Sequence, residues 1–321
     1  MKTTNSSAKQ KRFTPGTVVT GKWNQQQYSI VRKLGEGVTG TVYLAHSSER
    51  KVAIKFGIDH MSIAQEVNVL KELSKVQDTC LGPYLYEVDD YVQAGSKSIV
   101  PFYVMEYIKG IDFLRFMEGK GSEWLSVVVL QLLDQLQALH DHGWIFGDIK
   151  PENIIVTKNA TSVRLLDVGG TTKKDRAIKE YTELYDRGYW LGESRKAEVS
   201  YDLFSVAILM IHCAYPQQLR KQPEKPLAQL KKMIESSDQL KPFKKSMIGA
   251  LHGHYIQAGE MKQDLLRSQY QAESSPTLNR HSTTRMSRVN KQKKSYGYTE
   301  LFMLMTFVGL LITLYLVLKM F

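Results

Sequence analysis

The chain has very few cysteines, and this scarcity limits what it can be. Cys80 and Cys213 are the only two among 321 residues, and they lie far apart. A disulfide framework is therefore excluded, and two reduced thiols in a cytosolic domain are the better interpretation. No cluster of cysteine and histidine has the spacing of a zinc site. Residues 1–10 lack an apolar run, so they do not form a secretory signal peptide.

Acidic residues are also scarce relative to basic ones. There are 32 Asp and Glu against 43 Lys and Arg, which gives a net charge of +11. Such an excess points to nucleic acid, anionic lipid or acidic protein surfaces as partners, without choosing among them. A hydrophobic content of 43% is ordinary for a packed protein. The length allows one large two-lobed domain with extra segments, or two small domains.

Apolar runs long enough to span a membrane are absent except near the C-terminus. Residues 301–318 read LFMLMTFVGLLITLYLVL, without a charge. A helix rises about 1.5 Å per residue, so this run predicts a transmembrane helix over 299–319 rather than a buried core helix. More lysines precede the span than follow it, which predicts a single-pass cell-membrane protein whose bulk lies in the cytoplasm. Only residues 320–321 are then expected outside.

Residues 268–298 form a basic, Ser/Thr-rich linker that cannot bury a core. Flexible cations of this kind would contact DNA phosphates without reading sequence, or would meet an anionic bilayer surface. Both alternatives stay open, together with a solvated linker whose charges only fix topology. Between Ser274 and Ser295 the linker has no acidic residue, and its basic residues are Arg280, Arg285, Arg288, Lys291, Lys293 and Lys294.

The pattern of apolar residues divides the rest of the chain in two. Residues 1–27 are polar, and from residue 28 three alternating runs separated by glycines predict a β-meander. A helix is predicted over 64–73, and strands over 84–88 and 102–107. After residue 110 the spacing is mostly helical, with a long apolar helix that ends at Gly143. The apolar stretch that begins at Asp202 is too short for a membrane span and predicts a core helix.

A glycine-rich hairpin is predicted around Gly35, Gly37 and Gly40. Glycines let backbone N–H groups approach phosphates, although the same pattern can also open a dinucleotide-binding fold. Here a strand follows the hairpin, and the next strand carries Lys55 between apolar neighbours. A lysine in such a strand needs an anionic partner. Glu66 in the following helix is the best candidate, with Glu72 as the alternative.

A second cluster of polar residues has the layout of a phosphoryl-transfer site. Asp148, Lys150 and Asn153 lie in one short loop, and Asp167 follows a short strand about fifteen residues later. One aspartate can take the acceptor hydroxyl while the lysine screens the transferred phosphate. The asparagine and the second aspartate supply oxygen ligands for a divalent metal.

This ordered set resembles the eukaryotic-type serine/threonine protein kinases of the bacterial membrane-anchored kind, over roughly residues 28–266. The resemblance implies an α+β fold with a β-rich N-lobe (28–104), a hinge (105–110) and a mostly helical C-lobe (111–267), followed by the C-terminal transmembrane helix. It also implies protein substrates, ATP, and Mg²⁺ with Mn²⁺ as an alternative. The basic residue Lys150, two positions after Asp148, favours serine or threonine over tyrosine as the acceptor.

Roles for single residues follow from the same resemblance. Asp148 would accept the proton of the hydroxyl, Lys150 would contact the γ-phosphate, and Lys55, paired with Glu66, would hold the α- and β-phosphates. Asn153 and Asp167 would bind metal. Asp202 would brace the catalytic loop, and Glu193 would be the remaining acid of the Ala-Pro-Glu position. The nucleotide would lie against Leu34, Gly35, Gly37, Gly40, Val42, Ala53, Lys55, Glu106, Ile108 and Asp112.

Three positions depart from the family pattern. Where the family has His-Arg-Asp, this chain has Phe146-Gly147-Asp148. Where the family has Asp-Phe-Gly, the middle residue here is Val168, and of the family's Ala-Pro-Glu only Glu193 is kept. The resemblance places the activation segment over residues 167–193, with Thr171, Thr172 and Thr182 as candidate phosphorylation sites. The missing arginine normally pairs with a phosphate on this segment, so control through it is not expected. A catalytically dead scaffold that recruits partners to the membrane is the competing hypothesis. Signals are expected from the cytoplasm, from the bilayer or through a homodimer.

Overall fold

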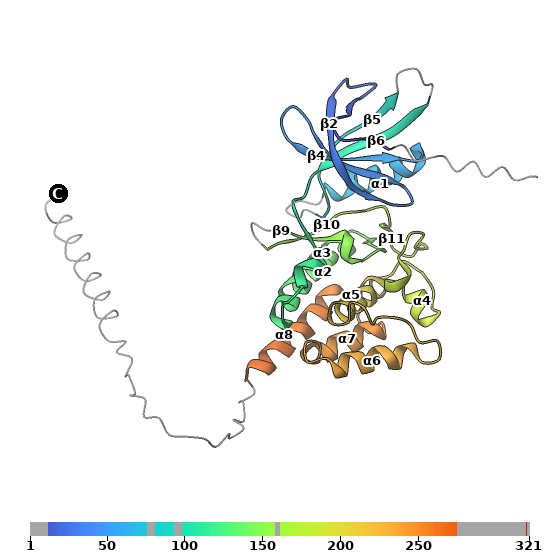
Figure 1. The fold of residues 1–321 in the computed structure, drawn as a ribbon. Helices are drawn as coiled ribbons and strands as arrows, with labels where there is room; N and C mark the ends of the chain where they lie inside the picture. The colour runs from blue at the N-terminus through green and yellow to red at the C-terminus, as the bar shows by residue number, and fades with distance from the viewer. Residues whose placement is uncertain (1–11, 76–80, 93–97, 158–160, 275–318, 320–321) are drawn as a thin grey trace, which may run out of the picture. The chain divides into compact units, whose positions relative to one another are not determined.

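The structure, a computed structural model, describes residues 12–75, 81–92, 98–157, 161–274 and 319 (Figure 1). The described residues from 12 to 274 belong to one compact unit. The strands and helices that position the candidate site all lie in this unit.

A six-stranded antiparallel sheet forms the small lobe, in the order β1-β2-β3-β4-β6-β5. Alternation of apolar and polar side chains directs Ile30, Tyr43, Phe56 and Phe102 into one buried cluster on a single face. The strands are β1 (Val18–Thr20), β2 (Gln27–Glu36), β3 (Gly40–His46), β4 (Lys51–Gly57), β5 (Leu85–Val92) and β6 (Ile99–Glu106).

The sheet begins before the boundary predicted at residue 28. β1 pairs with β2, and Phe13 packs on Phe56 with ring centroids 4.4 Å apart. Phe13 also meets Tyr43 edge-on. A three-residue strand within a polar stretch carries almost no periodic signal, so these long-range contacts decide its place.

Helix α1 (His60–Leu73) contacts β4, β5 and β6 of this sheet. It begins at Asp59, whose side chain accepts a hydrogen bond from the N–H of Ser62 at 2.8 Å, as an N-cap does. The helix buries Ile63, Glu66 and Leu70 on one face, because these positions are three and four residues apart. A carboxylate is thereby carried into an otherwise apolar interface.

The large lobe is mostly helical, as predicted, and is built around two buried helices. α3 buries an apolar face of leucines and valines, and α5 is buried at every residue from Tyr201 to Ile211. The helices are α2 (Phe113–Met117), α3 (Ser122–Asp141), α4 (Arg187–Leu191), α5 (Val199–Ala214), α6 (Pro226–Ser236), α7 (Lys244–Leu251) and α8 (Ala258–Ser274).

Short strands at the top of this lobe carry the loops that matter for function. One sheet has the order β10-β9-β7 and the other pairs β11 with β8. They comprise β7 (Gly110–Asp112), β8 (Trp144–Ile145), β9 (Ile154–Thr157), β10 (Val163–Leu165) and β11 (Thr172–Lys173). β9 and β10 lie between Asn153 and Asp167, two residues of the predicted phosphoryl-transfer cluster.

The C-terminal predictions fall largely outside the described residues. The linker predicted from residue 268 overlaps the end of α8, which continues to Ser274. The six basic linker residues and the predicted span, apart from Lys319, lie outside the described part of the chain. Within the described residues, no helix has the length and apolarity needed to cross a bilayer.

Candidate active site

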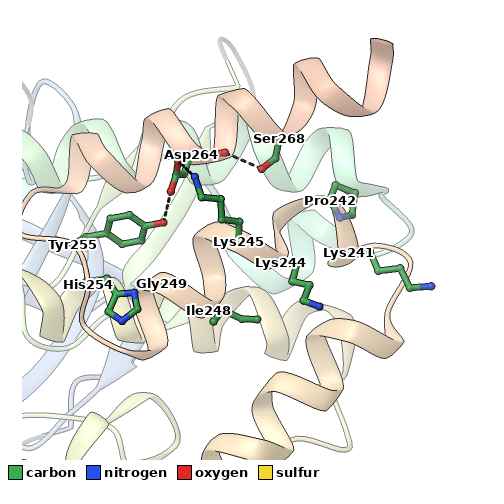
Figure 2. A pocket seen from close by; sticks show the side chains of 10 residues that line it. All are labelled: Lys241, Pro242, Lys244, Lys245, Ile248, Gly249, His254, Tyr255, Asp264 and Ser268. Carbon is green, nitrogen blue, oxygen red and sulfur yellow. Dashed lines mark hydrogen bonds and ion pairs between the residues drawn. The ribbon is translucent and has the colours of Figure 1, made fainter. Parts of the chain in front are cut away.

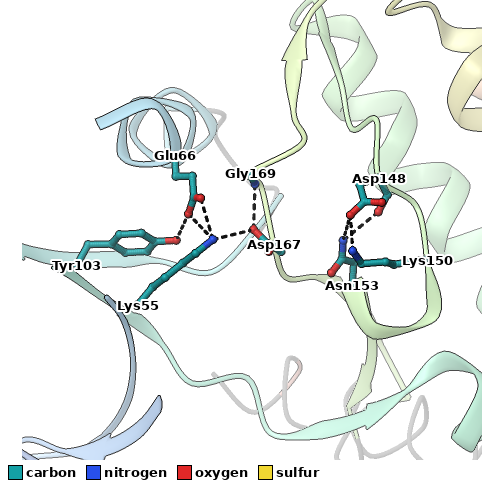
Figure 3. Close-up of polar contacts among 8 residues, drawn as sticks. All are labelled: Lys55, Glu66, Tyr103, Asp148, Lys150, Asn153, Asp167 and Gly169. Carbon is teal, nitrogen blue, oxygen red and sulfur yellow. Dashed lines mark hydrogen bonds and ion pairs between the residues drawn. The ribbon is translucent and has the colours of Figure 1, made fainter. Parts of the chain in front are cut away.

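Lys55 and Glu66 form a buried ion pair between β4 and α1 (Figure 3). The Lys55 Nζ lies 2.7 Å from Glu66 Oε2 and 2.8 Å from Oε1, and both side chains are 3% exposed. The alternative partner Glu72 instead pairs with Lys75 at the surface. The sequence-based choice of Glu66 over Glu72 therefore agrees with the geometry.

Asp167 lies on the other side of Lys55. Its Oδ1 is 3.4 Å from the Lys55 Nζ and accepts a hydrogen bond from the N–H of Gly169 at 3.0 Å. Burial alone would lower the pKa of Lys55, but the carboxylates of Asp167 and Glu66 outweigh it and raise that pKa. The lysine is thus held as a cation between two anions.

The catalytic loop gathers the three residues predicted for it. Lys150 Nζ lies 2.5 Å from Asp148 Oδ2, and Asn153 Nδ2 donates to the backbone carbonyl of Asp148 at 2.9 Å. A 3₁₀ turn over Pro151–Asn153 returns the chain so that the asparagine faces the aspartate. Figure 3 shows this group facing the Lys55 group across the site.

Thr182 belongs to this loop's contacts, although the sequence indicated only a candidate phosphorylation site there. Its hydroxyl donates to Asp148 Oδ1 at 2.9 Å, and Lys150 Nζ approaches it at 3.3 Å. The threonine lies 34 positions from Asp148 in the chain. Since nothing local connects the two, sequence reasoning had no signal for this contact.

Asp202 at the start of α5 supports the loop from below. It is fully buried and accepts hydrogen bonds from the N–H groups of Phe146 and Gly147, each at 2.9 Å. His140 Nε2 lies 2.8 Å from the same carboxylate. The predicted bracing contact is therefore present.

Glu193 and Asp186 hold the end of the activation segment. Glu193 lies 3.3 Å from Arg187, so the predicted structural acid has a partner. Asp186, which the sequence analysis missed, is 1% exposed and accepts from Arg195 and from the hydroxyl of Tyr201 at 2.8 Å each. It also caps α4 through the N–H groups of Gly188 and Tyr189, at 3.0 and 2.8 Å.

Glu180 is a further carboxylate beside the site that sequence reasoning did not single out. Burial raises its pKa, and the neighbouring anions of Asp167 and Glu66 raise it further, against the opposing effect of Lys55. Negative charge is therefore in excess around the lysine.

The hinge and the glycine hairpin carry most of the residues that were predicted to contact the nucleotide. The N–H of Glu106 donates to the carbonyl of Tyr84 at 2.8 Å, so this N–H is already paired. The Glu106 side chain binds Arg164 of β10 at 2.8 Å, which ties the hinge to the large lobe. Asp112 caps α2 through the N–H of Arg115.

The remaining predicted nucleotide residues lie in strands β2 to β4 or in the connections that follow β2 and β6. Ala53 and Ile108 are buried, and Leu34 and Val42 are half-buried. A side-chain carbon placed at Gly35 or Gly37 would meet nothing within 4 Å, so space is open over the hairpin. In the hairpin itself the N–H of Gly37 donates to the carbonyl of Gly40 at 2.9 Å.

A separate hollow of about 590 Å³ lies between α7 and α8, lined in part by Lys241, Lys244 and Lys245 (Figure 2). These lysines pair with Asp238, Glu235 and Asp264, in that order. The hollow contributes no residue to the site above, and its lysine charges are already balanced by acidic side chains.

Comparisons with known proteins agree with this geometry. Residues 28–286 match the protein kinase domain family. The chain is 46% identical over 283 residues to the serine/threonine-protein kinase YabT of Bacillus subtilis (strain 168), which covers 88% of this chain and 83% of that protein. It is 30% identical over 212 residues to the probable serine/threonine-protein kinase pknA2 of Bifidobacterium longum, covering 61% of this chain and 26% of that longer protein.

Among solved structures, vaccinia related kinase 3 matches with a TM-score of 0.60 and 17% identity, over 84% of this chain and 94% of that one. At this identity the match supports the fold alone, a β-rich small lobe on a helical large lobe. Taken with the sequence matches, it leaves one conclusion: the chain belongs to the protein kinase family, as a bacterial serine/threonine protein kinase that resembles YabT.

Proposed function

We propose that this kinase transfers the γ-phosphoryl group of Mg-ATP to protein hydroxyls with Asp148 as the residue that orients the hydroxyl and takes its proton. The observation that carries the proposal is the buried Lys55–Glu66 pair with Asp167 only 3.4 Å from the lysine. A cation held between two fixed carboxylates is positioned for phosphate and costs little reorganisation when phosphate arrives.

The residues present suit a magnesium ion. Asp167 offers a carboxylate, and because Asn153 uses its Nδ2 as a donor to Asp148, its Oδ1 is the atom left for a cation. Within the described residues, no group of three or more His, Cys, Asp or Glu forms a metal cage. Mg²⁺ prefers one or two such protein oxygens together with substrate phosphates, and when bound it neutralises phosphate charge. Mn²⁺ accepts the same ligands.

The chain's own residues then divide the work. Lys55 binds the α- and β-phosphates, and Glu66 fixes its ammonium group. Lys150 screens the γ-phosphate. Asp148 is held at both oxygens, by Thr182 at one and by Lys150 at the other, so its orientation towards an acceptor is set in advance.

The test is transfer of labelled phosphate from Mg-ATP by the full-length protein. Asp148→Asn should lower kcat by about a hundredfold to ten-thousandfold, since general-base catalysis contributes that much. The matched control is Asp141→Asn, because Asp141 is exposed and its carboxylate accepts a hydrogen bond from Gln137, outside the site. Undiminished transfer by Asp148→Asn would instead favour the scaffold that recruits partners to the membrane.

The proposal includes a location. A helix over 299–319 anchors the protein in the cell membrane, with the kinase domain in the cytoplasm. The support is the uncharged run of the sequence and the excess of lysine before it. Two arginines in the span, Leu310→Arg and Leu311→Arg together, should move the protein from the membrane fraction to the soluble fraction, since each costs about 2.5–3.5 kcal/mol at the bilayer centre. Persistence in the membrane fraction would contradict the anchor.

The proposal also assigns a role to the basic linker, residues 268–298. The linker binds DNA non-specifically, and DNA binding raises the kinase activity. The support is the set of six basic residues without an acidic neighbour. Duplex DNA should bind the full-length protein with an affinity that falls steeply as salt rises, and replacing the six with glutamine should abolish binding. If the glutamine variant loses binding to anionic vesicles but not to DNA, the linker is assigned to lipid.

Light scattering of the same samples reports whether a homodimer forms.

A further inference from the structure

Tyr103 lies directly across the sheet from Lys55. The two residues are register partners in the β4–β6 ladder, so their side chains leave the same face, the one that α1 covers. Tyr103 is 2% exposed, and its hydroxyl donates a hydrogen bond to Glu66 Oε2 at 2.8 Å (Figure 3). Glu66 is thus held from two directions by residues of adjacent strands.

Lys55 cannot satisfy this carboxylate by itself. Glu66 is 2% exposed, and a buried carboxylate that lacks partners is strongly disfavoured. The single lysine is shared between Glu66 and Asp167, so two negative charges face one positive charge. A second donor at Glu66 Oε2 offsets this imbalance, and Tyr103 supplies it.

Tyr103 is a dependable donor. Burial, and then the negative charges of Glu66 and Asp167, hold the pKa of the phenol well above its ordinary value. The hydroxyl therefore stays protonated throughout the physiological pH range. No phosphorylation or ligand is needed for it to act.

We propose that Tyr103 is a positioning residue that holds Glu66, and with it α1 and the ammonium group of Lys55, in the arrangement that binds ATP phosphates. The inference rests on the proposed function of Lys55 and Glu66. It explains how α1 is kept against the sheet in a kinase that lacks the family's arginine before Asp148. The chain itself provides the hydrogen bond that stabilises this position.

Tyr28→Phe is a matched control for Tyr103→Phe. Tyr28 is in the same sheet, is 5% exposed, and its hydroxyl donates to a carboxylate, Glu87 Oε2, at 2.6 Å. Each substitution removes one hydroxyl from one tyrosine–carboxylate pair. Only Tyr103 touches the proposed site, so the two variants separate positioning from general stability.

The experiment measures steady-state phosphate transfer by the full-length protein, with Mg-ATP and the protein acceptor varied in turn. Tyr103→Phe should lower kcat/KM for Mg-ATP by roughly tenfold to a hundredfold, as expected for a lost hydrogen bond to a charged group. The KM for the protein acceptor should not change, since neither Tyr103 nor Glu66 contacts it. Tyr28→Phe should leave both constants at the parent values, although Tm falls in both variants.

A second comparison separates the positioning role of Tyr103 from the proposed function of Lys55 and Glu66. In a Glu66→Gln background, Tyr103→Phe should add little to the loss, because its only route to the site has gone. If Glu66→Gln is impaired while Tyr103→Phe behaves like Tyr28→Phe, the inference is overturned and the proposed function stands. If Lys55→Met and Glu66→Gln both keep parent activity, the proposed function fails, and the inference fails with it.

Discussion

Gly147, the residue before Asp148, allows a quantitative test of how the catalytic loop is built. Its φ is +81°, in the left-handed region. A Cβ at this position would lie 2.7 Å from the carbonyl oxygen of Gly170 and 3.0 Å from Ile178 Cδ1. Gly143 has a similar φ of +74°, but a Cβ there would meet nothing within 4 Å. Alanine at the two positions therefore separates backbone strain from the close contact.

The expected magnitudes follow from these distances. A non-glycine residue in the left-handed region costs about 1–2 kcal/mol, and the reduced freedom of the unfolded chain returns about 0.4–1 kcal/mol. Gly143→Ala should therefore destabilise the protein by at most about 1.6 kcal/mol. Gly147→Ala should cost about 1–3 kcal/mol more, because the backbone of Gly170 has to move to relieve the overlap.

Calorimetry and phosphate transfer by the full-length protein provide the measurements. One kcal/mol lowers Tm by about 2–4 °C in a domain of this size, so the two variants should be distinguishable. A displacement of about 1 Å can cost a hundredfold in rate, and Asp148 adjoins the perturbed residue. Gly147→Ala should therefore lower kcat on that scale, whereas Gly143→Ala should not.

Gly147→Arg restores the arginine of the family pattern and is expected to be at least as damaging as Gly147→Ala. Two results would refute the reasoning. One is an equal loss of stability in the two alanine variants, with kcat retained in both. The other is a gain of activity in Gly147→Arg.

Three further predictions concern the activation segment and the small lobe. Thr182→Val should lower kcat by roughly tenfold or more by removing the donor to Asp148, whereas Thr182→Ser should keep it; equal losses would contradict the role of the hydroxyl. Asp186→Ala should lower the free energy of unfolding by about 1–3 kcal/mol, because the buried hydroxyl of Tyr201 and the first N–H groups of α4 lose their acceptor; an unchanged denaturant midpoint would rule this out. Burial alone would raise the pKa of Asp89, but backbone N–H donors lower it. The stability that Asp89 contributes is therefore fully present above its unfolded pKa of about 3.9, and it is lost as pH falls through the lower folded pKa. Asp89→Asn should flatten the acid limb of a curve of stability against pH. Parallel curves for the variant and the parent protein would contradict this.

Much of the site could be predicted because its parts are local. Asp148, Lys150 and Asn153 lie in one loop, and their identities alone restrict the chemistry. Glu66 could be chosen over Glu72 because it shares a helix face with the apolar residues that pack on the sheet. Periodicity decides such questions without any tertiary information.

The contacts that escaped prediction are long-range. Tyr103 depends on the register between β4 and β6, which no local pattern specifies, and Thr182 reaches Asp148 from a distant part of the chain. β1 and Phe13 were assigned to a polar segment because their partners, β2 and Phe56, lie beyond any local window. Propensity and residue spacing predict individual helices and strands, whereas these contacts depend on the tertiary packing of elements that are distant in the sequence.

Phe146 and Val168 both differ from the residues that the family pattern has at these positions. The family's histidine is replaced by the larger phenylalanine, and its phenylalanine by the smaller valine. Both side chains are buried in the same core cluster, at 1% and 2% exposure. Both positions therefore keep an apolar side chain in the core, and cores tolerate hydrophobic exchanges when total volume is roughly kept. These two changes alone do not indicate a dead enzyme.

The activation segment has internal contacts that bear on the missing arginine. Asp186 accepts hydrogen bonds from Arg195, from Tyr201 and from the start of α4, so the segment's C-terminal end is fixed by an aspartate of the chain itself. In the family pattern, a phosphate and the arginine before the catalytic aspartate share that task. If these contacts order the segment and Tyr103 holds α1 as proposed, we expect neither element to require phosphorylation. Control is then expected at the level of membrane or nucleic-acid contact, outside the two lobes.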